Sequence, residues 1–284
     1  MSQEKRSGLV SAQWVHAHLS DPALVILDVR WRLDDALAGH RLYIEEHLPG
    51  AHFVDLERDL CAPEGGGRHP LPNRRDFVHA MRRVGIHPDS RVVVYDDLSG
   101  TSAARLWWLL DVHGLPEVAL LDGGLQAWKR AGMPTEKGEV HATKEGSFDG
   151  KPDERRWVER EHLVKNRLTL VDARAPERYR GEIEPIDPRA GHIPGAINLP
   201  FTENLDGPPG DGRFKPKQEL INRFKLLVDK KPVFYCGSGV TACHNLLAWR
   251  VAGFPDALLY PGSWSEWCAD PEAPIALGDQ GEEE

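Results

Sequence analysis

Apolar residues fall into short runs along the chain, and polar or glycine-rich segments separate these runs. Four runs rich in Val, Ile and Leu occupy the first half, and four similar runs follow in the second half. Strands of a parallel sheet are covered on both faces, so they are apolar throughout instead of alternating with polar residues. The runs therefore predict strands at 24–29, 51–55, 91–95 and 118–121, and again at 168–172, 196–199, 232–235 and 257–260.

Helical patterns alternate with the predicted strands. The segments 102–110 and 242–251 are apolar at helical spacing, and each follows a predicted strand almost directly. Alternating strands and helices are typical of α/β domains, in which helices cover both faces of a parallel sheet. We expect each half of the chain to form such a three-layer domain.

The two halves also resemble each other in sequence. Four pairs of segments match in the same order, with offsets between 139 and 145 residues. A period of this length indicates a duplicated domain and not a solenoid, whose repeats are about 20–50 residues long. The matching pairs are LVILDVR (24–30) with LTLVDAR (168–174), HLPGAHFVDL (47–56) with HIPGAINLPF (192–201), RVVVYDD (91–97) with KPVFYCG (231–237), and LLDGGLQAW (120–128) with LYPGSWSEW (259–267).

A polar segment without apolar periodicity separates the two copies. Its Gly and Pro residues favour a loop. We predict one domain over 1–138, a linker over 139–156 and a second domain over 157–284. The length of 284 residues agrees with about two domains.

Composition narrows the classes of function. The net charge of −9 argues against nucleic acid and against an anionic membrane as the main partner. No apolar run reaches the length of a membrane span, and the first ten residues lack the apolar core of a signal peptide. Four cysteines in 284 residues exclude a disulfide-dense scaffold, and no Cys-x-x-Cys occurs. We expect a cytoplasmic protein.

The strongest chemical signal lies at the end of the strand 232–235. Cys236 follows this strand, and Gly237, Ser238 and Gly239 lead into the helix that begins near 242. Ligand sites in parallel sheets form at the carboxyl ends of strands. A glycine-rich turn before a helix points several N–H groups inward and adds the positive end of the helix. Both effects favour a thiolate, so Cys236 is a candidate nucleophile, and the turn can also hold an extra sulfur or an anion.

The alternative is that Cys236 is merely a small apolar residue at the end of a core strand. The first copy helps to weigh this alternative, because Asp96 stands there at the position of Cys236. The first copy thus lacks the nucleophile. One active and one inactive domain is the interpretation that we favour.

The repeated HLPGA and HIPGA segments, the loop YCGSGVTAC and the element PGSWSEW resemble motifs of the two-domain rhodanese-type sulfurtransferases. The resemblance covers nearly the whole chain. It implies tandem duplicated rhodanese-like domains, each a parallel sheet flanked by helices, of which the second is catalytic. It also implies that Cys236 takes up a sulfane sulfur as a persulfide and passes it to an acceptor. The loop Cys236–Thr241, with Gly237, Gly239, Val240 and Thr241 around Ser238, resembles the 3-mercaptopyruvate type.

The thiosulfate type usually carries basic side chains where this chain has Gly237 and Ser238. A neutral loop suits a mono-anionic carboxylate donor better than dianionic thiosulfate. A carboxylate donor needs a cation, preferably an arginine. By resemblance, Arg180 and Arg189 match the arginines that bind the donor, whereas we expect Arg174 and Arg178 to be structural.

Three further residues are assigned to the site by the resemblance. The Ser238 hydroxyl can relay a proton as the C–S bond breaks. In related enzymes an acidic residue and a histidine from the first half face this serine, and Glu57 and His69 match them here. Asp55 is an alternative for the acidic role. We expect His47 and His192, which occur at the same place in both copies, to be structural.

Other functions remain open. Cys-x5-Arg phosphatases also place a cysteine on a backbone turn, but Ala242 stands where the phosphate-binding arginine would be. A thiosulfate-preferring rhodanese, or a non-catalytic module that binds or delivers sulfur, is also compatible with the motifs. No metal or organic cofactor is implied. The expected partners are a small anionic sulfur donor and a thiol acceptor such as thioredoxin, or cyanide.

Overall fold

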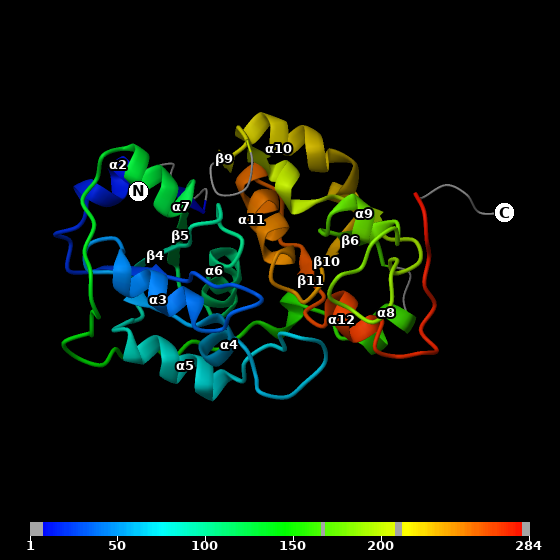
Figure 1. The fold of residues 1–284 in the computed structure, drawn as a ribbon, viewed down its shortest axis with the longest axis horizontal. Helices are drawn as coiled ribbons and strands as arrows, with labels where there is room; N and C mark the ends of the chain where they lie inside the picture. Colours follow the sequence, from blue (N-terminus) through cyan, green and yellow to red (C-terminus); the bar gives the residue numbers. More distant parts are fainter. Residues whose placement is uncertain (1–7, 166–167, 208–211, 280–284) are drawn as a thin grey trace. The chain divides into compact units, whose positions relative to one another are not determined.

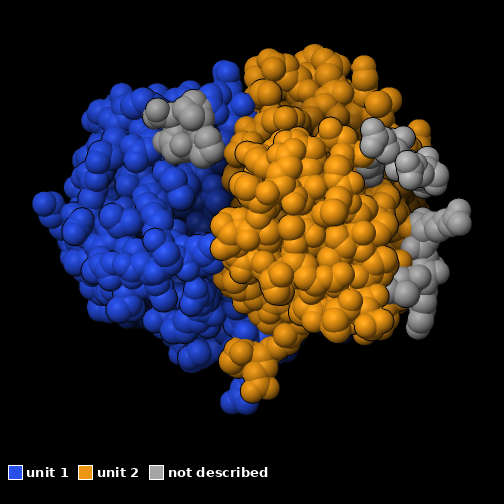
Figure 2. Space-filling model, turned by 45° about the vertical axis from the view of Figure 1, so that its right-hand side comes forward, with its two compact units in different colours: residues 1–62, 72–153, 205–214 blue, residues 63–71, 154–204, 215–284 orange. Residues whose placement is uncertain are grey.

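The computed structural model describes residues 8–165, 168–207 and 212–279 (Figure 1). The chain forms two compact units, which Figure 2 shows in different colours. Unit 1 consists of residues 1–62, 72–153 and 205–214, and unit 2 of residues 63–71, 154–204 and 215–284. Each unit therefore contains a short segment from the opposite half of the sequence, which the duplication pattern does not predict.

The core of unit 1 is a five-stranded parallel sheet with the order β1-β5-β4-β2-β3. All four strands predicted for the first copy are confirmed, although the run 51–55 yields only a two-residue strand. β1 was not predicted, because two residues are too few to show a pattern. The strands are β1 (Leu9–Val10), β2 (Leu24–Asp28), β3 (His52–Phe53), β4 (Arg91–Tyr95) and β5 (Glu117–Leu121).

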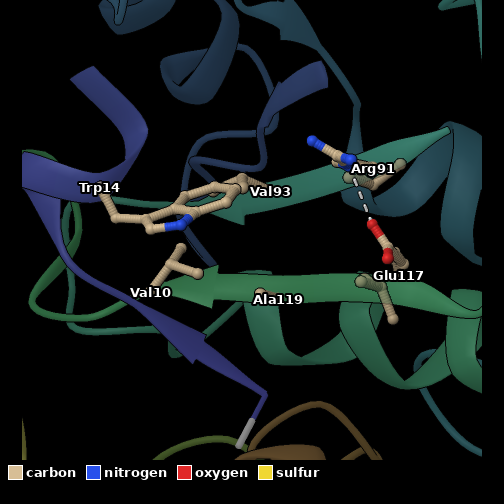
Figure 3. Close-up of a pocket in the computed structure, with 8 residues that line it drawn as sticks. Val10, Trp14, Arg91, Val93, Glu117 and Ala119 are labelled. Atoms are coloured by element: carbon tan, nitrogen blue, oxygen red, sulfur yellow. Dashed lines mark ion pairs between the residues drawn. The ribbon is translucent and has the colours of Figure 1, made fainter. Parts of the chain in front are cut away.

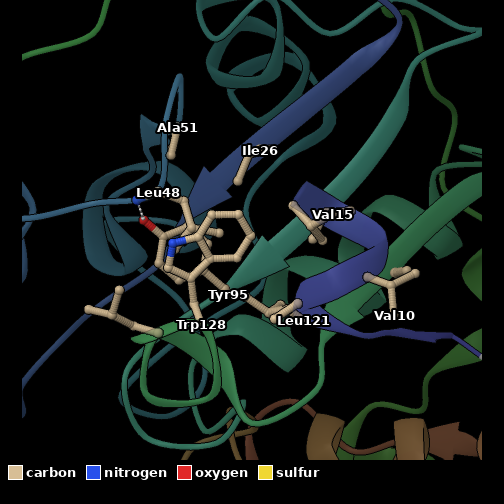
Figure 4. Close-up of a cluster of buried hydrophobic side chains, with 12 residues drawn as sticks. Val10, Val15, Ile26, Leu48, Ala51, Tyr95, Leu121 and Trp128 are labelled. Atoms are coloured by element: carbon tan, nitrogen blue, oxygen red, sulfur yellow. Dashed lines mark hydrogen bonds between the residues drawn. The ribbon is translucent and has the colours of Figure 1, made fainter. Parts of the chain in front are cut away.

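Helices cover the sheet of unit 1. Alternate side chains of β2, β4 and β5 point to the same face, because the side-chain period of a strand is two residues. On one face Ile26, Tyr95 and Leu121 pack against Val15 of α2 and Trp128 of α7 (Figure 4). The helices of unit 1 are α2 (Ala12–Ala17), α3 (Ala38–Glu45), α4 (Leu56–Leu60), α5 (Arg74–Arg83), α6 (Ala103–Val112) and α7 (Gly124–Arg130).

Unit 2 contains a four-stranded parallel sheet with the order β11-β10-β6-β7. This order repeats β5-β4-β2-β3 of unit 1, as the duplication predicts. The strands are β6 (Leu170–Asp172), β7 (Ile197–Asn198), β10 (Val233–Tyr235) and β11 (Leu258–Leu259), and all four predicted runs are confirmed. The helices are α8 (Arg160–Lys165), α9 (Pro176–Tyr179), α10 (Lys217–Phe224), α11 (Ala242–Ala252) and α12 (Ser263–Trp267), with 3₁₀ turns η1 (Glu154–Arg156), η2 (Phe201–Asn204) and η3 (Lys225–Lys230).

The two histidines of the repeated motif have the same structural role in both units. His47 Nδ1 is 2.8 Å from the carbonyl oxygen of Tyr43, and its ring stacks on that tyrosine. His192 makes the matching contacts to Tyr179, with a ring separation of 3.7 Å. Since a carbonyl only accepts, Nδ1 carries the proton in each case. The motif therefore fastens the entry of β3 or β7 to the preceding helix.

The described ends of the segment 205–214 form a short antiparallel strand pair in unit 1. It consists of β8 (Leu205–Asp206) and β9 (Arg213–Phe214). The backbone N–H of Phe214 donates to the carboxylate of Asp122, which directly follows β5, at 2.8 Å. The segment predicted as a linker also belongs to unit 1 as far as Asp153, because N–H groups of Gly146, Phe148 and Asp153 bond to carbonyls of that unit.

None of the helices within the described ranges combines the length and apolarity that a membrane crossing requires. Within the same ranges, His, Cys, Asp and Glu do not gather in any group of three or more that could hold a metal ion.

Candidate active site

Cys236 lies at the carboxyl end of β10, in a tight loop that leads into α11. The side chain is buried, with 1% of its surface exposed. The backbone N–H of Gly239 points at Sγ, with a distance of 3.1 Å between nitrogen and sulfur. The loop thus turns back so that one of its N–H groups faces the sulfur. This is the geometry that the glycine-rich turn predicts.

Gly239 makes this winding possible. Its φ of +74° lies in the left-handed region, where residues with a side chain are strained. A Cβ atom at this position would lie 2.5 Å from the carbonyl oxygen of Pro261. Only glycine allows the loop to turn here against the segment that precedes α12.

The first turn of α12 holds the loop from the other side. Ser263 Oγ accepts the N–H of Cys236 at 3.1 Å. The N–H groups of Trp264 and Ser265 donate to the carbonyls of Cys236 and Gly237, each at 2.9 Å. The repeated element PGSWSEW therefore positions the backbone of the nucleophile.

Ser238 forms a buried pair with His69. Its Oγ lies 2.8 Å from Nδ1 of the histidine, and both side chains are less than a tenth exposed. A hydroxyl and an imidazole nitrogen can each donate or accept, so the pair can pass a proton in either direction. His69 lies in the segment 63–71, which belongs to unit 2.

The segment 63–71 is fastened next to the loop. The N–H of Arg68 donates to Ser265 Oγ at 3.0 Å. The carboxylate of Glu266 lies so close to Gly66 that a Cβ there would be 1.9 Å from Oε1. The glycine-rich stretch thus lets the backbone approach α12 closely and brings His69 to Ser238.

Two arginines lie beside Gly237. The three atoms nearest to the position of a Cβ on this glycine are Nη2 of Arg68 at 3.3 Å and the two Nη atoms of Arg178 at 3.6 and 3.8 Å. Asp187 joins the two guanidinium groups, because it accepts from Arg68 at 2.7 Å and from Arg178 at 3.1 Å. Arg178 also pairs with Glu184. Burial alone would raise the pKa of Glu184, but the hydrogen bonds from Arg178 and the backbone hold that pKa below its ordinary value.

The sequence analysis missed Arg68 and assigned Arg178 a structural role. Two arginines that are two residues apart on a helix point about 200° away from each other. The motif RYRG at 178–181 therefore places only one of them toward a given site, and the pattern does not say which one. For Arg68, the signal available in the sequence is its position directly before His69.

Arg180 and Arg189, which the resemblance assigns to the donor, have other contacts here. Arg180 Nε donates to Glu182 at 2.7 Å on the surface. Arg189 donates to the backbone carbonyls of Asp270 and Ala273. The binding role of both residues stays a prediction. Arg174 pairs with Asp172 in the core and its guanidinium lies over the ring of Trp264, which is the structural role expected of it.

Glu57 lies on α4 of unit 1, where its carboxylate accepts a hydrogen bond from Trp31. Asp55 caps the same helix, since its carboxylate accepts the N–H groups of Glu57 and Arg58. The catalytic role of Glu57, and the alternative role of Asp55, remain predictions. In the loop itself, Val240 is buried and Thr241 forms the N-cap position of α11.

The corresponding loop of unit 1 is filled by its own side chain. Asp96 is buried, and its carboxylate accepts the N–H groups of Leu98, Gly100, Ser102 and Ala103 at 2.8–2.9 Å. In unit 1 an internal carboxylate thus accepts the N–H groups of the loop that corresponds to the Cys236 loop. These N–H groups are already bonded, and the loop has no cysteine.

A small cavity in unit 1 lies between Val10, Trp14, Val93 and Ala119, near the ion pair of Arg91 and Glu117 (Figure 3). Its volume of 20 Å³ is close to the space for one water molecule. It is too small for a substrate.

Comparisons with known proteins identify the family of the chain. The model of the rhodanese-like domain matches residues 11–131 and 157–270. The chain is 50% identical over 283 residues to a probable 3-mercaptopyruvate sulfurtransferase of Pseudomonas aeruginosa, covering 95% of this chain and 98% of that protein. It is 44% identical to a putative thiosulfate sulfurtransferase, SseB, of Mycobacterium tuberculosis, covering 89% of this chain and 90% of that protein.

Solved structures show the same fold. The crystal structure of the 3-mercaptopyruvate sulfotransferase SseA from Escherichia coli superposes with a TM-score of 0.80 at 35% identity, covering 91% of this chain and 99% of that one. The 3-mercaptopyruvate sulfurtransferase from Leishmania major gives a TM-score of 0.84 at 28% identity, covering 95% and 76%. With two matched domains and relatives along nearly its whole length, the chain belongs to the rhodanese-like family of sulfurtransferases.

Proposed function

We propose that the protein transfers sulfur from 3-mercaptopyruvate to a thiol or to cyanide, through a persulfide on Cys236. The observation that carries the proposal is the buried Sγ of Cys236, which faces the N–H of Gly239. Ser238, two residues after Cys236 in the same loop, is hydrogen-bonded to His69 of the segment 63–71. A thiolate is a nucleophile, and the N–H of Gly239 that faces it can also donate to the persulfide that replaces it.

In the first step the thiolate of Cys236 attacks the sulfur of the donor. A new S–S bond forms and the C–S bond of mercaptopyruvate breaks. The electron pair of that bond stays on carbon as the enolate of pyruvate, which takes up one proton to become pyruvate. Ser238 supplies this proton and His69 replaces it, because their hydrogen bond of 2.8 Å connects them directly.

In the second step the acceptor attacks the outer sulfur of the persulfide. The S–S bond breaks, and its electron pair returns to Cys236 as the thiolate. A thiol acceptor such as thioredoxin leaves as a persulfide, and cyanide leaves as thiocyanate. The donor carboxylate is held by Arg178, whose guanidinium lies beside Gly237. Arg180 and Arg189 are further predicted contacts of the donor. Glu57 is the predicted acidic partner of His69.

We also propose that the protein works in the cytoplasm, which is a reducing compartment. It is supported by the four cysteines, all of which are free. Burial raises the pKa of Cys61 to about 11, so this partly exposed thiol is protonated and unreactive at neutral pH.

The test is steady-state kinetics with 3-mercaptopyruvate and cyanide for the wild type, Cys236→Ser and the control Cys61→Ser. We expect Cys236→Ser to lose at least about 10³-fold in kcat and Cys61→Ser to keep wild-type turnover. Mass spectrometry after addition of the donor alone should show one added sulfur atom on the wild type and none on Cys236→Ser.

Full activity of Cys236→Ser would overturn the proposal. A stable persulfide on Cys236 without turnover of any small acceptor would instead favour a sulfur-delivery module.

A further inference from the structure

The N–H of Cys236 lies at the point where the ladder between β10 and β11 would continue. The two strands pair in parallel, and the N–H of Tyr260 donates to the carbonyl of Phe234 at 2.9 Å. In a regular parallel ladder, the next hydrogen bond would run from the N–H of Cys236 to the carbonyl of Tyr260. Instead, Ser263 Oγ accepts the N–H of Cys236 at 3.1 Å and donates to the carbonyl of Tyr260 at 2.9 Å. The backbone of the nucleophile is therefore joined to β11 through a side chain of α12.

The two hydrogen bonds fix the direction in which the hydroxyl of Ser263 points. A carbonyl oxygen only accepts, so the hydroxyl hydrogen is directed at Tyr260, and a lone pair of Oγ faces the N–H of Cys236. The side chain is fully buried, which withdraws both bonds from bulk water. Ser263 thus orients the backbone at Cys236 and has no hydrogen left to donate to the sulfur, which separates its role from that of Ser238.

The backbone of Ser263 is strained. Its φ of +54° lies in the left-handed region, which residues with a side chain adopt rarely. The repeat aligns Ser263 with Gly124 of unit 1, whose φ of +55° is almost the same. Glycine adopts this conformation without strain. Unit 2 therefore has a serine where its duplicate has the residue that suits the backbone better, and strained residues of this kind gather at functional sites.

The comparison of the two units also indicates that the side chain of Ser263 changes the loop. A Cβ atom on Gly124 would lie 2.3 Å from the carbonyl oxygen of Asp96, the residue that corresponds to Cys236. A serine therefore fits only where this carbonyl has moved away. In unit 2 the loop makes this room and still keeps the bond from the N–H of Trp264 to the carbonyl of Cys236, at 2.9 Å. The side chain at position 263 thus contributes to the orientation of the peptide that follows the nucleophile.

We propose that Ser263 is a positioning residue for sulfur transfer at Cys236: its hydroxyl bridges the ends of β10 and β11 and sets the orientation of the backbone that carries the nucleophile. The inference rests on the proposed function and adds a residue to that site. Because Ser263 contacts the backbone of Cys236 and not the donor, its loss should slow the attack by the sulfur and leave donor binding nearly unchanged. A displacement of a reacting group by about 1 Å can reduce the rate about 10²-fold.

The experiment uses Ser263→Ala and Ser263→Gly, which both remove the hydroxyl, with 3-mercaptopyruvate as donor and cyanide as acceptor. We expect kcat to fall about 10–100-fold in both variants and KM to change less than about 3-fold. Mass spectrometry of single-turnover samples should show that persulfide formation on Cys236 slows by the same factor. Hydrogen exchange of the Cys236 amide, followed by NMR, should become at least about 10-fold faster, because the amide has lost its buried acceptor.

Ser99 provides the matched control. It is a buried serine with a φ of +57° in the loop of unit 1 that corresponds to the Cys236 loop and has no cysteine. Ser99→Ala and Ser99→Gly should keep the kcat of the wild type. At both positions the glycine variant should have a higher urea midpoint than the alanine variant, because glycine relieves the backbone strain that alanine keeps.

Wild-type kcat in the Ser263 variants would overturn the inference, and either variant decides this if the other does not fold. Equal losses of kcat in the Ser99 variants would also overturn it, because they would indicate general destabilisation. A loss that lies entirely in KM would place Ser263 in donor binding and contradict a positioning role. If the wild type does not turn over 3-mercaptopyruvate, the proposed function fails, and an unchanged exchange rate of the Cys236 amide would then still overturn the bridge.

Discussion

Single residues decide the chemistry of the Cys236 loop through what surrounds them. Gly237 and Gly239 look alike in the sequence, yet they serve different purposes. Gly239 has a φ of +74° and faces the carbonyl of Pro261, whereas Gly237 leaves room for the guanidinium groups of Arg68 and Arg178. Gly237 thus leaves space for side chains from elsewhere in the chain, and Gly239 determines the path of the backbone.

Replacement of Gly239 by alanine should damage both stability and activity. The added Cβ would lie 2.5 Å from the carbonyl oxygen of Pro261 at a φ that alanine rarely adopts. We expect a loss of about 1–3 kcal/mol in the free energy of unfolding from this strain. Urea denaturation measures the loss, and kcat with 3-mercaptopyruvate should fall as the N–H of residue 239 moves away from Sγ.

Gly195→Ala is the matched control, because Gly195 has a φ of +78° but no atom within 4 Å of the added Cβ. It carries the backbone strain without the collision. If Gly239→Ala were no less stable and no less active than this control, the close approach to Pro261 would have no energetic weight.

At the scale of elements, the same strand–loop–helix arrangement holds a cysteine in unit 2 and a buried aspartate in unit 1. β10, the loop and α11 present Cys236, while β4, the loop and α6 enclose Asp96. Burial raises the pKa of Asp96, and the backbone N–H groups of Ala103, Gly100 and Leu98 act against this rise. The carboxylate of Asp96 thus satisfies the N–H groups of its own loop from within the chain.

Asp96→Ala should strongly destabilise unit 1. The substitution leaves the N–H groups of Leu98, Gly100, Ser102 and Ala103 buried without their acceptor. Buried donors that lose their partner cost about 1–3 kcal/mol each, and partial relaxation reduces the sum, so we expect a loss of about 3–5 kcal/mol. Chemical denaturation followed by tryptophan fluorescence measures this change.

The neighbouring Asp97→Ala provides the comparison. Asp97 pairs with Arg32, whose side chain is 30% exposed. Such a partly exposed pair contributes about 1 kcal/mol or less. A loss in Asp96→Ala no larger than that in Asp97→Ala would show that the carboxylate is not what holds the loop.

At the scale of the whole molecule, the duplication does not divide the chain into two independent halves. The segment 63–71 belongs to unit 2 and the segment 205–214 to unit 1. As a result, His69 from the first half of the sequence reaches Ser238 in the second. A fragment that contains only residues 157–284 would lack His69 and Arg68.

The stability of the molecule should also depend on pH through His113. Burial lowers the pKa of His113 to about 4, from an ordinary value of 6.5, and the hydrogen bond to the carbonyl of Leu109 only partly offsets this effect. Above pH 6.5 the histidine is neutral in both the folded and the unfolded state. Between pH 6.5 and 4 only the unfolded state takes up the proton, so stability decreases as the pH falls through this window.

From the two pKa values, His113 should remove about 2 kcal/mol of the free energy of unfolding between pH 7.5 and pH 5. Urea denaturation at both pH values, for the wild type and His113→Gln, tests this. The variant should lose less stability over the interval, by about this amount. Equal losses in both proteins would mean that His113 titrates alike in the folded and unfolded states.

The sequence by itself determined the local parts of this protein. Each of the eight continuous apolar runs forms a strand in the structure, as predicted. The prediction was possible because burial on both faces of a parallel sheet leaves a local sequence pattern. The spacing of Cys236, Gly237 and Gly239 after such a run predicted the loop around the sulfur, because a strand followed by a glycine-rich turn and a helix is determined by neighbouring residues. The repeat identified two domains and the single copy with the nucleophile.

Only the tertiary structure decided which distant groups lie beside the Cys236 loop. Arg68 reaches Gly237 because the segment 63–71 belongs to unit 2. Arg178 of α9 also reaches Gly237, whereas Arg180, just beyond the end of α9, pairs with Glu182 on the surface. Neither the position of Arg68 nor that of Arg178 leaves a periodic pattern in the sequence. Each position depends on how separate elements pack and on the ion pairs that the arginines form with Asp187. The cysteine loop is therefore a local property of the chain, whereas the charged groups beside it are placed by the fold.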